Sequence, residues 1–288
     1  MVSVPMHNRI ICIEIFGLWG KFDLRWDLSP RVNVLSGLNG SGKSTTLHAL
    51  ACLLRGKSFS DEELQRVRSV AVTFDDGSTL SSESAGNKPV RNVDVISTFD
   101  SRLKDPDALQ KLSEGEVRTE IDWEIYRLQK RYITYQLAQG KKIISLLTCH
   151  APQSEIEAIN NQKTEFFDLV DSLLGKTHKT SDRTSDELSF LSDDGTRLSP
   201  YMLSAGEKQL LLILATALTQ DSVPSILLMD EPDISMHFDW QTSLLENVLK
   251  INPNAQLIVS THSPALVMNG WLDTVSEVSD LVVKRYNG

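Results

Sequence analysis

The sequence predicts an α/β fold in which a mostly parallel sheet presents functional groups at the ends of its strands. Two apolar runs without polar alternation, residues 225–229 and 256–260, are typical of strands buried on both faces. A short strand expected at residues 31–35 leads into a glycine-rich turn at 37–45 and then a helical pattern over 44–54. A strand, a glycine-rich turn and a helix in this order predict a phosphate-binding half of such a sheet.

The turn has the pattern G-x-x-x-x-G-K-S of a phosphate-binding loop. Its glycines allow backbone N–H groups to approach an anion closely, and the following helix adds the positive end of its dipole. Lys43 supplies a point charge for the β- and γ-phosphates, and the Ser44 hydroxyl is placed to ligate Mg²⁺. The candidate nucleotide-binding residues of the loop are Asn39, Gly40, Ser41, Gly42, Lys43, Ser44 and Thr45.

Polar groups follow both buried strands. Asp230 and Glu231 end the run at 225–229, and a buried strand does not carry two acids without partners. His262 follows the run at 256–260, where a neutral imidazole can contact a γ-phosphate. The alternatives are a strand that ends in solvated acids and a histidine with a structural role.

The segment Leu-Ser-Ala-Gly-Glu-Lys-Gln at 203–209 resembles the LSGGQ-type signature of ABC ATPases, in the variant of the SMC-like branch. The resemblance implies that Ser204, Ala205 and Gly206 bind the γ-phosphate held by the opposite subunit. Ala205 departs from the glycine of the family pattern. The same stretch also predicts a capped helix, with Ser204 as N-cap and Glu207 three residues later.

The same family resemblance assigns the remaining roles. It implies that Asp230 and Ser44 hold Mg²⁺, that Glu231 polarises the attacking water and that His262 is the switch histidine. Residues 233–237 resemble the D-loop that crosses the dimer interface. ATP and Mg²⁺ are the expected cofactors, and a homodimer or higher homo-oligomer joined through an ATP sandwich is the expected assembly. The resemblance implies an ABC-type P-loop head with an N-terminal antiparallel β-subdomain and a helical insertion.

The sequence around these motifs, at residues 239–241, 252–256 and 269–271, resembles that of bacterial "AAA family" ATPases of defence islands. These include the overcoming-lysogenization-defect (OLD) nucleases and the ATPase subunit of PARIS-type anti-phage systems. Because the chain ends soon after His262, we expect the effector, a Toprim-like nuclease or a toxin, to be a separate protein. The alternatives are a DNA repair or recombination ATPase that clamps DNA directly, and a transporter ATPase subunit.

Composition limits the function classes. The 288 residues are 41% hydrophobic, which suffices for one large α/β domain or a head with an insertion. The net charge of -9 argues against a uniformly basic DNA-coating surface but leaves room for a local groove. No signal peptide or membrane span is apparent, so a cytoplasmic protein is expected. Cys12, Cys52 and Cys149 show no metal or disulfide spacing and are expected to be buried free thiols.

We expect three regions. Residues 1–104 form an N-terminal ATPase lobe, 105–187 a helical insertion with a mobile loop at 175–187, and 188–288 a C-terminal ATPase lobe. Strands are expected at 9–16, 21–26, 31–35, 69–74, 78–80 and 94–97, helices within 121–147 and around 166–173, and a hairpin at 187–199.

Three assignments stay open at this point. No convincing glutamine marks a Q-loop, and Ile96–Asp100 occupies its place, where a hydroxyl or Asp100 could contact Mg²⁺. Arg9, Lys21 and Trp26 are candidates to touch the adenine base, or are plain surface or core residues. The basic residues at 127, 130 and 131 form a solvated helix face or a contact with DNA or a partner.

Overall fold

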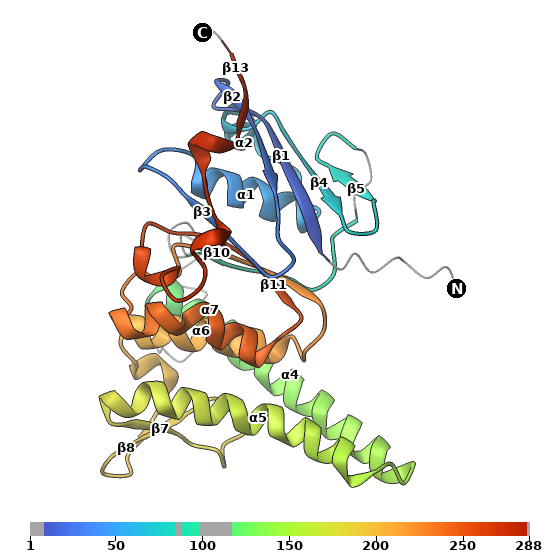
Figure 1. Ribbon diagram of the computed structural model, residues 1–288. Helices are drawn as coiled ribbons and strands as arrows, with labels where there is room; N and C mark the ends of the chain where they lie inside the picture. Colours follow the sequence, from blue (N-terminus) through green and yellow to red (C-terminus); the bar gives the residue numbers. More distant parts are fainter. Residues whose placement is uncertain (1–8, 85–87, 98–116, 287–288) are drawn as a thin grey trace. The chain divides into compact units, whose positions relative to one another are not determined.

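The computed structural model describes residues 9–84, 88–97 and 117–286. The chain forms two compact units (Figure 1). Unit 1 comprises the described parts of residues 1–99, 223–233 and 254–288, and unit 2 comprises those of residues 100–222 and 234–253. The fold class is the expected α/β class, with one parallel sheet and one antiparallel sheet in unit 1.

The parallel sheet of unit 1 has the strand order β12-β3-β11-β10-β6. Its strands are β3 (Val32–Ser36), β6 (Val93–Ser97), β10 (Ser225–Asp230), β11 (Ala255–Ser260) and β12 (Val275–Glu277). Every residue of β10 and β11 is buried, which confirms the two apolar runs as interior strands. Their register pairs Asp230 with Ser260, so both strands end at the same level. The groups that follow them, Glu231 and His262, therefore lie at one edge of the sheet.

The antiparallel sheet of unit 1 has the order β13-β2-β1-β4-β5. Its strands are β1 (Ile10–Leu18), β2 (Phe22–Asp27), β4 (Ser69–Phe74), β5 (Thr79–Ser81) and β13 (Val282–Arg285). The expected alternation in β2 fails at Asp23, which is buried. Asp23 accepts hydrogen bonds from the Gly17 N–H (2.7 Å) and the Tyr286 hydroxyl (2.7 Å), so its carboxylate ties β1 and the end of the chain to β2.

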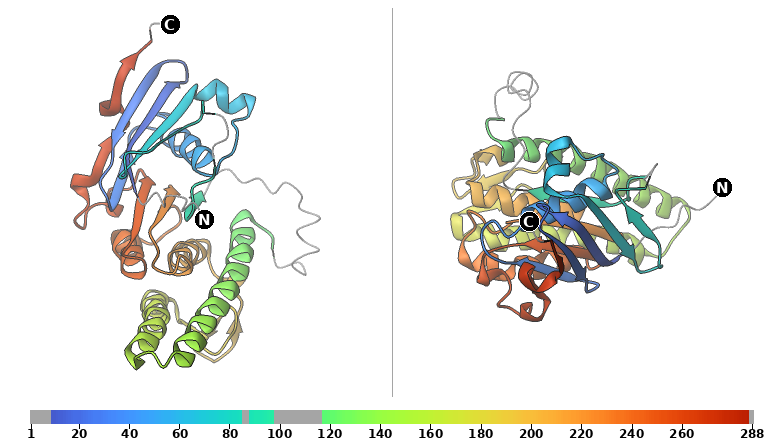
Figure 2. Two further views of the ribbon diagram at one scale, coloured as in Figure 1. Left: turned by 90° about the vertical axis from the view of Figure 1, so that its right-hand side faces the viewer. Right: turned by 90° about the horizontal axis from the view of Figure 1, so that it is seen from above.

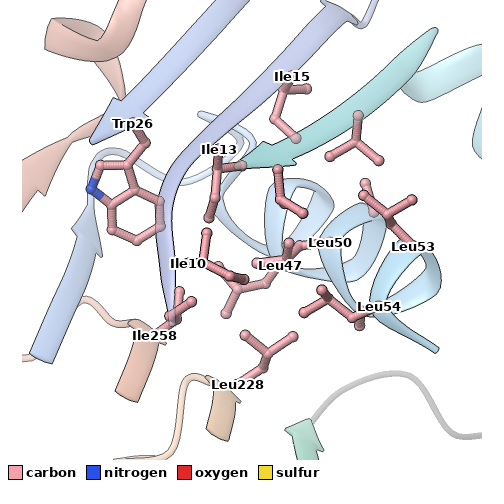
Figure 3. Close-up of a cluster of buried hydrophobic side chains, with 14 of the residues drawn as sticks. Ile10, Ile13, Ile15, Trp26, Leu47, Leu50, Leu53, Leu54, Leu228 and Ile258 are labelled. Atoms are coloured by element: carbon pink, nitrogen blue, oxygen red, sulfur yellow. The ribbon is translucent and has the colours of Figure 1, made fainter. Parts of the chain in front are cut away.

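Helix α1 (Lys43–Leu54) packs into the hydrophobic core shared with both sheets (Figure 3). Leu47 and Leu50 of α1 meet Ile13 of β1 as well as Leu228 of β10 and Ile258 of β11. Large aliphatic side chains at these positions exclude water on both sides of the helix. The core therefore fixes the position of the helix that begins at Lys43.

Unit 2 contains the helices α4 (Glu120–Thr148), α5 (Gln153–Leu174), α6 (Ala205–Thr219) and α7 (Phe238–Ile251). The first two form a helical hairpin joined by residues 149–152 (Figure 2). A small antiparallel sheet consists of β7 (Lys179–Ser181), β8 (Phe190–Ser192) and β9 (Arg197–Leu198). Short 3₁₀ turns are η1 (Gly175–Thr177) and η2 (Pro200–Met202) in unit 2, and η3 (Pro264–Leu266), η4 (Leu272–Thr274) and η5 (Val278–Leu281) in unit 1.

The expectation of a mobile loop at 175–187 was wrong. This segment contains η1 and strand β7, which pairs with β8. The Ser181 N–H donates to the Asp171 carboxylate (2.6 Å), and the Asp182 N–H donates to the Ser189 carbonyl (2.8 Å). Local polar composition suggested a loop, but these partners from elsewhere in unit 2 satisfy the backbone and order it.

Some elements of the structure were not predicted from the sequence. Helix α2 (Asp61–Arg66) has a capping box between Ser60 and Glu63, and α7, β12 and β13 were not expected. Within the described ranges, no helix combines the length and apolar character needed to cross a membrane.

Candidate functional site

The phosphate-binding loop joins β3 to α1 and is shaped by its glycines. Gly42 is the N-cap of α1 and has φ 106°, a conformation that glycine adopts without strain. A Cβ at Gly42 would lie 2.7 Å from Leu18 Cδ2, so the close packing of the loop on β1 also requires glycine. The loop is therefore held against β1 with the N-terminus of α1 at its end, the arrangement that binds an anion.

Lys43 lies at the centre of a cluster of ionisable groups. Its ammonium donates to the Gly37 carbonyl (3.1 Å) and lies 2.5 Å from His262 Nε2. Burial lowers the pKa of Lys43, while Glu231 and Asp230 oppose that shift. The lysine is thus bound to its own loop carbonyl and to the histidine, and a phosphate oxygen would offer it a stronger, charged partner.

The Ser44 hydroxyl and the Asp230 carboxylate meet directly. Ser44 Oγ donates to Asp230 Oδ1 (3.1 Å), and the Ser260 hydroxyl hydrogen-bonds to the same oxygen. A hydroxyl and a carboxylate at this spacing are oxygen ligands of the kind Mg²⁺ takes beside a bound phosphate. The residues therefore fit a magnesium ion, with Ser260 orienting the carboxylate from behind.

Glu231 follows Asp230 in a strained backbone conformation. Its φ is 50°, in the left-handed region that non-glycine residues rarely adopt. Its N–H donates to the Ser260 carbonyl (3.0 Å), and its Oε1 lies 3.4 Å from His262 Nε2. Burial raises the pKa of Glu231 above its usual range, although His262 lowers it. A carboxylate with a raised pKa is a better proton acceptor.

Asp233 and Thr261 join the two loops that follow β10 and β11. The Thr261 hydroxyl donates to the buried Asp233 carboxylate and accepts from the Ser263 N–H (2.9 Å). The first residue of the D-loop is thereby fixed to the loop that carries His262.

The remaining residues of the phosphate-binding loop differ in how far they are exposed to solvent. Asn39 and Gly40 are exposed and Thr45 is half-buried. The Ser41 hydroxyl is buried and has no hydrogen-bond partner within the described parts of the chain. An unpaired buried hydroxyl in this loop is available to a phosphate oxygen.

In unit 2, the signature segment begins α6. Ser204 Oγ accepts from the Glu207 N–H (3.4 Å), and Glu207 Oε2 accepts from the Ser204 N–H (2.8 Å). This confirms the expected capping box. Ser204 and Ala205 are exposed at the helix N-terminus, whereas Gly206 is buried. A Cβ at Gly206 would lie 2.2 Å from the Ser235 carbonyl oxygen, so the D-loop backbone packs directly on the signature.

Two ion pairs between a buried carboxylate and a half-buried lysine support the signature helix, and sequence reasoning missed both. Glu207 Oε1 accepts from Lys179 Nζ (2.9 Å) and from Thr177 Oγ1 (2.6 Å). Lys208 Nζ donates to Asp122 Oδ1 (2.7 Å) in the first turn of α4. The two charges after the signature therefore connect α6 to the β7 segment and to the helical hairpin. Only three-dimensional contact reveals these pairs, because the partners are far apart in the sequence.

The candidate adenine contacts, the cysteines and the Q-loop segment can each be compared with the structure. Trp26 is buried, and its indole N–H donates to Ser276 Oγ (3.0 Å), so it is a core residue and not an adenine contact. Arg9 is half-buried and Lys21 is exposed, and both stay candidates. Cys12 and Cys52 are buried as expected, but Cys149 is exposed. The Q-loop question falls largely on residues 98–100, which lie outside the described residues.

The basic residues of α4 have local partners. Arg127 bonds to Glu124 (3.0 Å), and the Lys130 ammonium lies 4.5 Å from the centre of the Tyr126 ring. These contacts favour the interpretation of a solvated helix face.

The fold is that of SMC heads, a class of P-loop ATPases. A crystal structure of "the SmcHead bound to the C-winged helix domain of ScpA" gives a TM-score of 0.53 over 90% of this chain and 92% of that chain, at 15% identity. An Smc head with an extended coiled coil, bound to a ScpA domain derived from Pyrococcus furiosus, also gives 0.53, over 90% and 91%, at 13% identity. At these identities the likeness shows the fold that the chain shares with the two heads.

A family model described as "AAA domain, putative AbiEii toxin, Type IV TA system" matches residues 32–269, and the chain belongs to this family. The Septu protein PtuA of Bacillus thuringiensis is 22% identical over 95% of this chain and 78% of its own length. The "Retron Vc95 probable ATPase" of Vibrio cholerae serotype O1 biovar El Tor is 24% identical over 54% of this chain. The chain spans 34% of the length of that retron protein. The "Retron Ec83 probable ATPase" of Escherichia coli is 38% identical over 26% of this chain and 17% of its own length.

Proposed function

We propose that this chain hydrolyses ATP with Mg²⁺ at composite sites formed by two copies, and that this cycle gates a separate effector protein in anti-phage defence. One observation carries the ATPase part: Lys43, Asp230, Glu231 and His262 meet at the edge of one parallel sheet. This is where α/β sheets bind their ligands.

The chemistry follows from the geometry of these groups. Lys43 and the N-terminus of α1 bind the phosphates of ATP, while Ser44 and Asp230 hold Mg²⁺. When bound, Mg²⁺ neutralises charge on the phosphate oxygens. Glu231 orients the attacking water and accepts its proton, and the neighbouring His262 contacts the terminal phosphate. The raised pKa of Glu231 suits it to the role of base.

We further propose that the signature acts on the ATP held by a second copy. Ser204 and Ala205 are exposed at the N-terminus of α6, and this end of a helix attracts anions. The γ-phosphate bound by one subunit would then meet Ser204, Ala205 and Gly206 of the other. A homodimer of this kind contains two composite sites, and pairs of dimers would give a higher homo-oligomer.

Mixed subunits test the composite site. Lys43→Ala removes the phosphate lysine and Ser204→Arg obstructs the signature, so each variant alone should be inactive. An equal mixture should recover about a quarter of wild-type ATP turnover, because half of the dimers are mixed and each has one intact site. If the mixture stays inactive although the two variants associate, the composite site is wrong.

The effector part of the proposal concerns the helical hairpin. The second half of α4 exposes three apolar side chains, Leu137, Ile144 and Leu147, that take no part in the ATP site. Exposed apolar side chains on one helix are typical of a docking surface. The relatives from Septu and retron systems favour a defence role, in which the effector would be a Toprim-like nuclease or a toxin.

The hairpin also limits how docking can be tested. Deletion of residues 121–147 would remove the whole exposed surface of α4, but Ile125, Tyr132 and Tyr135 of this segment are buried in unit 2. Asp122 also binds Lys208 behind the signature. Deletion would therefore damage unit 2 itself, and substitution of exposed side chains is the suitable test.

The alternative function is a DNA repair or recombination ATPase that clamps DNA directly. The basic residues of α4 at 130, 131 and 141 would supply the contacts to DNA, whereas Lys142 pairs with Asp221. A nuclease and DNA-binding assay on the purified chain with Mg²⁺ and ATP distinguishes the two. Tight DNA binding that weakens steeply with salt would favour the clamp. Cleavage by this chain alone, lost in Glu231→Gln, would contradict the proposal of a separate effector.

A further inference from the structure

Three side chains with metal-binding groups, an exposed histidine, a buried cysteine and a half-buried glutamate, meet where α2 approaches α1. His48 and Cys52 are four residues apart on α1, so they share one face of the helix. Glu63 comes from α2 and approaches the same face. Glu63 Oε1 lies 2.5 Å from His48 Nε2 and 3.5 Å from Cys52 Sγ, and Cys52 Sγ lies 3.6 Å from His48 Nε2.

These distances can be compared with those of a tetrahedral zinc site. Bond lengths of about 2.0 Å to nitrogen and oxygen and about 2.3 Å to sulfur place the sulfur about 3.5 Å from both the nitrogen and the oxygen. The distances from Cys52 Sγ, 3.6 Å to His48 Nε2 and 3.5 Å to Glu63 Oε1, are close to this value. The third edge, between His48 and Glu63, would have to lengthen to about 3.3 Å as a metal ion replaces their hydrogen bond.

The carboxylate is already oriented for this role. Glu63 Oε2 accepts a hydrogen bond from the Ser60 N–H (2.5 Å), and the Glu63 N–H donates to Ser60 Oγ (3.3 Å). This capping box holds one oxygen and directs Oε1 toward His48 and Cys52. A hydrogen bond to the second oxygen of a ligating carboxylate is a usual support of metal sites.

We propose that His48, Cys52 and Glu63 form a binding site for a divalent transition-metal ion, with Zn²⁺ as the best match. A nitrogen, a sulfur and an oxygen ligand favour Zn²⁺ over Mg²⁺ or Ca²⁺, which prefer oxygen alone. The Cys52 thiol releases its proton to solvent as its sulfur bonds the metal. Thiolate and carboxylate then balance the charge of the ion, and a water or a partner side chain completes the fourth position.

The site is separate from the magnesium position at Ser44 and Asp230 but lies on the same helix. His48 is one turn beyond Ser44 on α1, so a bound ion would fasten α2 to the helix that begins at the phosphate lysine. Cysteine and histidine spacing did not predict this site, because Glu63 reaches the helix only through the fold. The inference does not depend on the proposed function, since metal binding is measured without ATP.

Cobalt titration of the full chain tests the proposal, in reduced protein and with Mg²⁺ in excess. Co²⁺ should bind in one equivalent, show the near-ultraviolet absorption of a cobalt–thiolate bond, and be displaced by Zn²⁺. Cys52→Ser should remove this band, and His48→Gln should weaken binding by about tenfold or more. The matched controls Cys149→Ser and His150→Gln, which alter an exposed cysteine and histidine elsewhere, should bind as the wild type does.

Glu63→Gln gives a second variant in case Cys52→Ser does not fold. Glutamine can keep the capping box with Ser60 while it removes the anionic ligand, so weaker Co²⁺ binding in a folded protein supports the site. The proposal is overturned if the wild type shows no cobalt–thiolate band. It is equally overturned if folded Cys52→Ser or Glu63→Gln binds Co²⁺ with unchanged affinity and spectrum.

Discussion

Replacement of Gly206 by alanine tests how closely the signature and the D-loop pack. The alanine Cβ would lie 2.2 Å from the Ser235 carbonyl oxygen, whereas real Cβ atoms essentially never come closer than 3.0 Å. The contact must therefore open by about 0.8 Å, and the Ser235 oxygen belongs to the backbone, which cannot rotate away as a side chain can. We expect Gly206→Ala to lower the free energy of unfolding by about 1–3 kcal/mol, the usual cost of overpacking.

The displaced D-loop should also affect catalysis, so the variant is expected to lose most of its ATP turnover. Chemical denaturation and steady-state phosphate release measure the two effects. Gly140→Ala is the matched control, because it also lies in a helix but its Cβ would meet no atom within 4 Å. The control should keep full turnover and gain about 0.5–1 kcal/mol of stability. If Gly206→Ala behaves like Gly140→Ala, the close packing described here is wrong.

Three further predictions follow from the site and the hairpin. Lys43→Ala should abolish ATP binding measured by calorimetry, because the lysine and the loop carry the phosphate contacts; binding at wild-type affinity would contradict this role. Without nucleotide, Glu231→Gln should be more stable than the wild type at neutral and alkaline pH but not in acid. Burial raises the folded-state pKa of Glu231, so its cost is absent below the ordinary carboxyl pKa and fully present above the raised value; equal melting temperatures at pH 8 would contradict this. Ile144→Ser with Leu147→Ser should keep ATP turnover and lose association with the proposed effector, whereas Lys141→Ser, an exposed control on the same helix, should change neither.

The parts of the site that follow parallel strands could be predicted from the sequence. The apolar runs before Asp230 and His262 have the length and composition of buried strands, and the register of β10 and β11 does bring the groups that follow them together. The strand at 69–74 has the expected bounds. These features can be predicted because they depend only on the local composition of each strand and on the rule that parallel strands end at the same edge of a sheet.

The remaining features depend on contacts between distant segments. The polar segment at 175–187 resembles a loop until Asp171 and Ser189 supply its backbone partners. Asp23 occupies an expected surface position in β2, but β13 covers it and Tyr286 binds it. The pair of Lys208 with Asp122 joins helices that are far apart in the chain. Neither periodicity nor motif spacing carries information about these pairings, so local reasoning cannot find them.

The most direct test of the proposed ATPase is steady-state phosphate release by Glu231→Gln, measured beside ATP binding by the same protein. Lys43, Ser44 and Asp230 remain intact, so the variant should bind ATP with an affinity close to that of the wild type. Its turnover should fall by ~10²–10⁴-fold, because glutamine can hold a water molecule but cannot accept its proton. Phosphate release at the wild-type rate would contradict the assignment of Glu231 as the group that activates water.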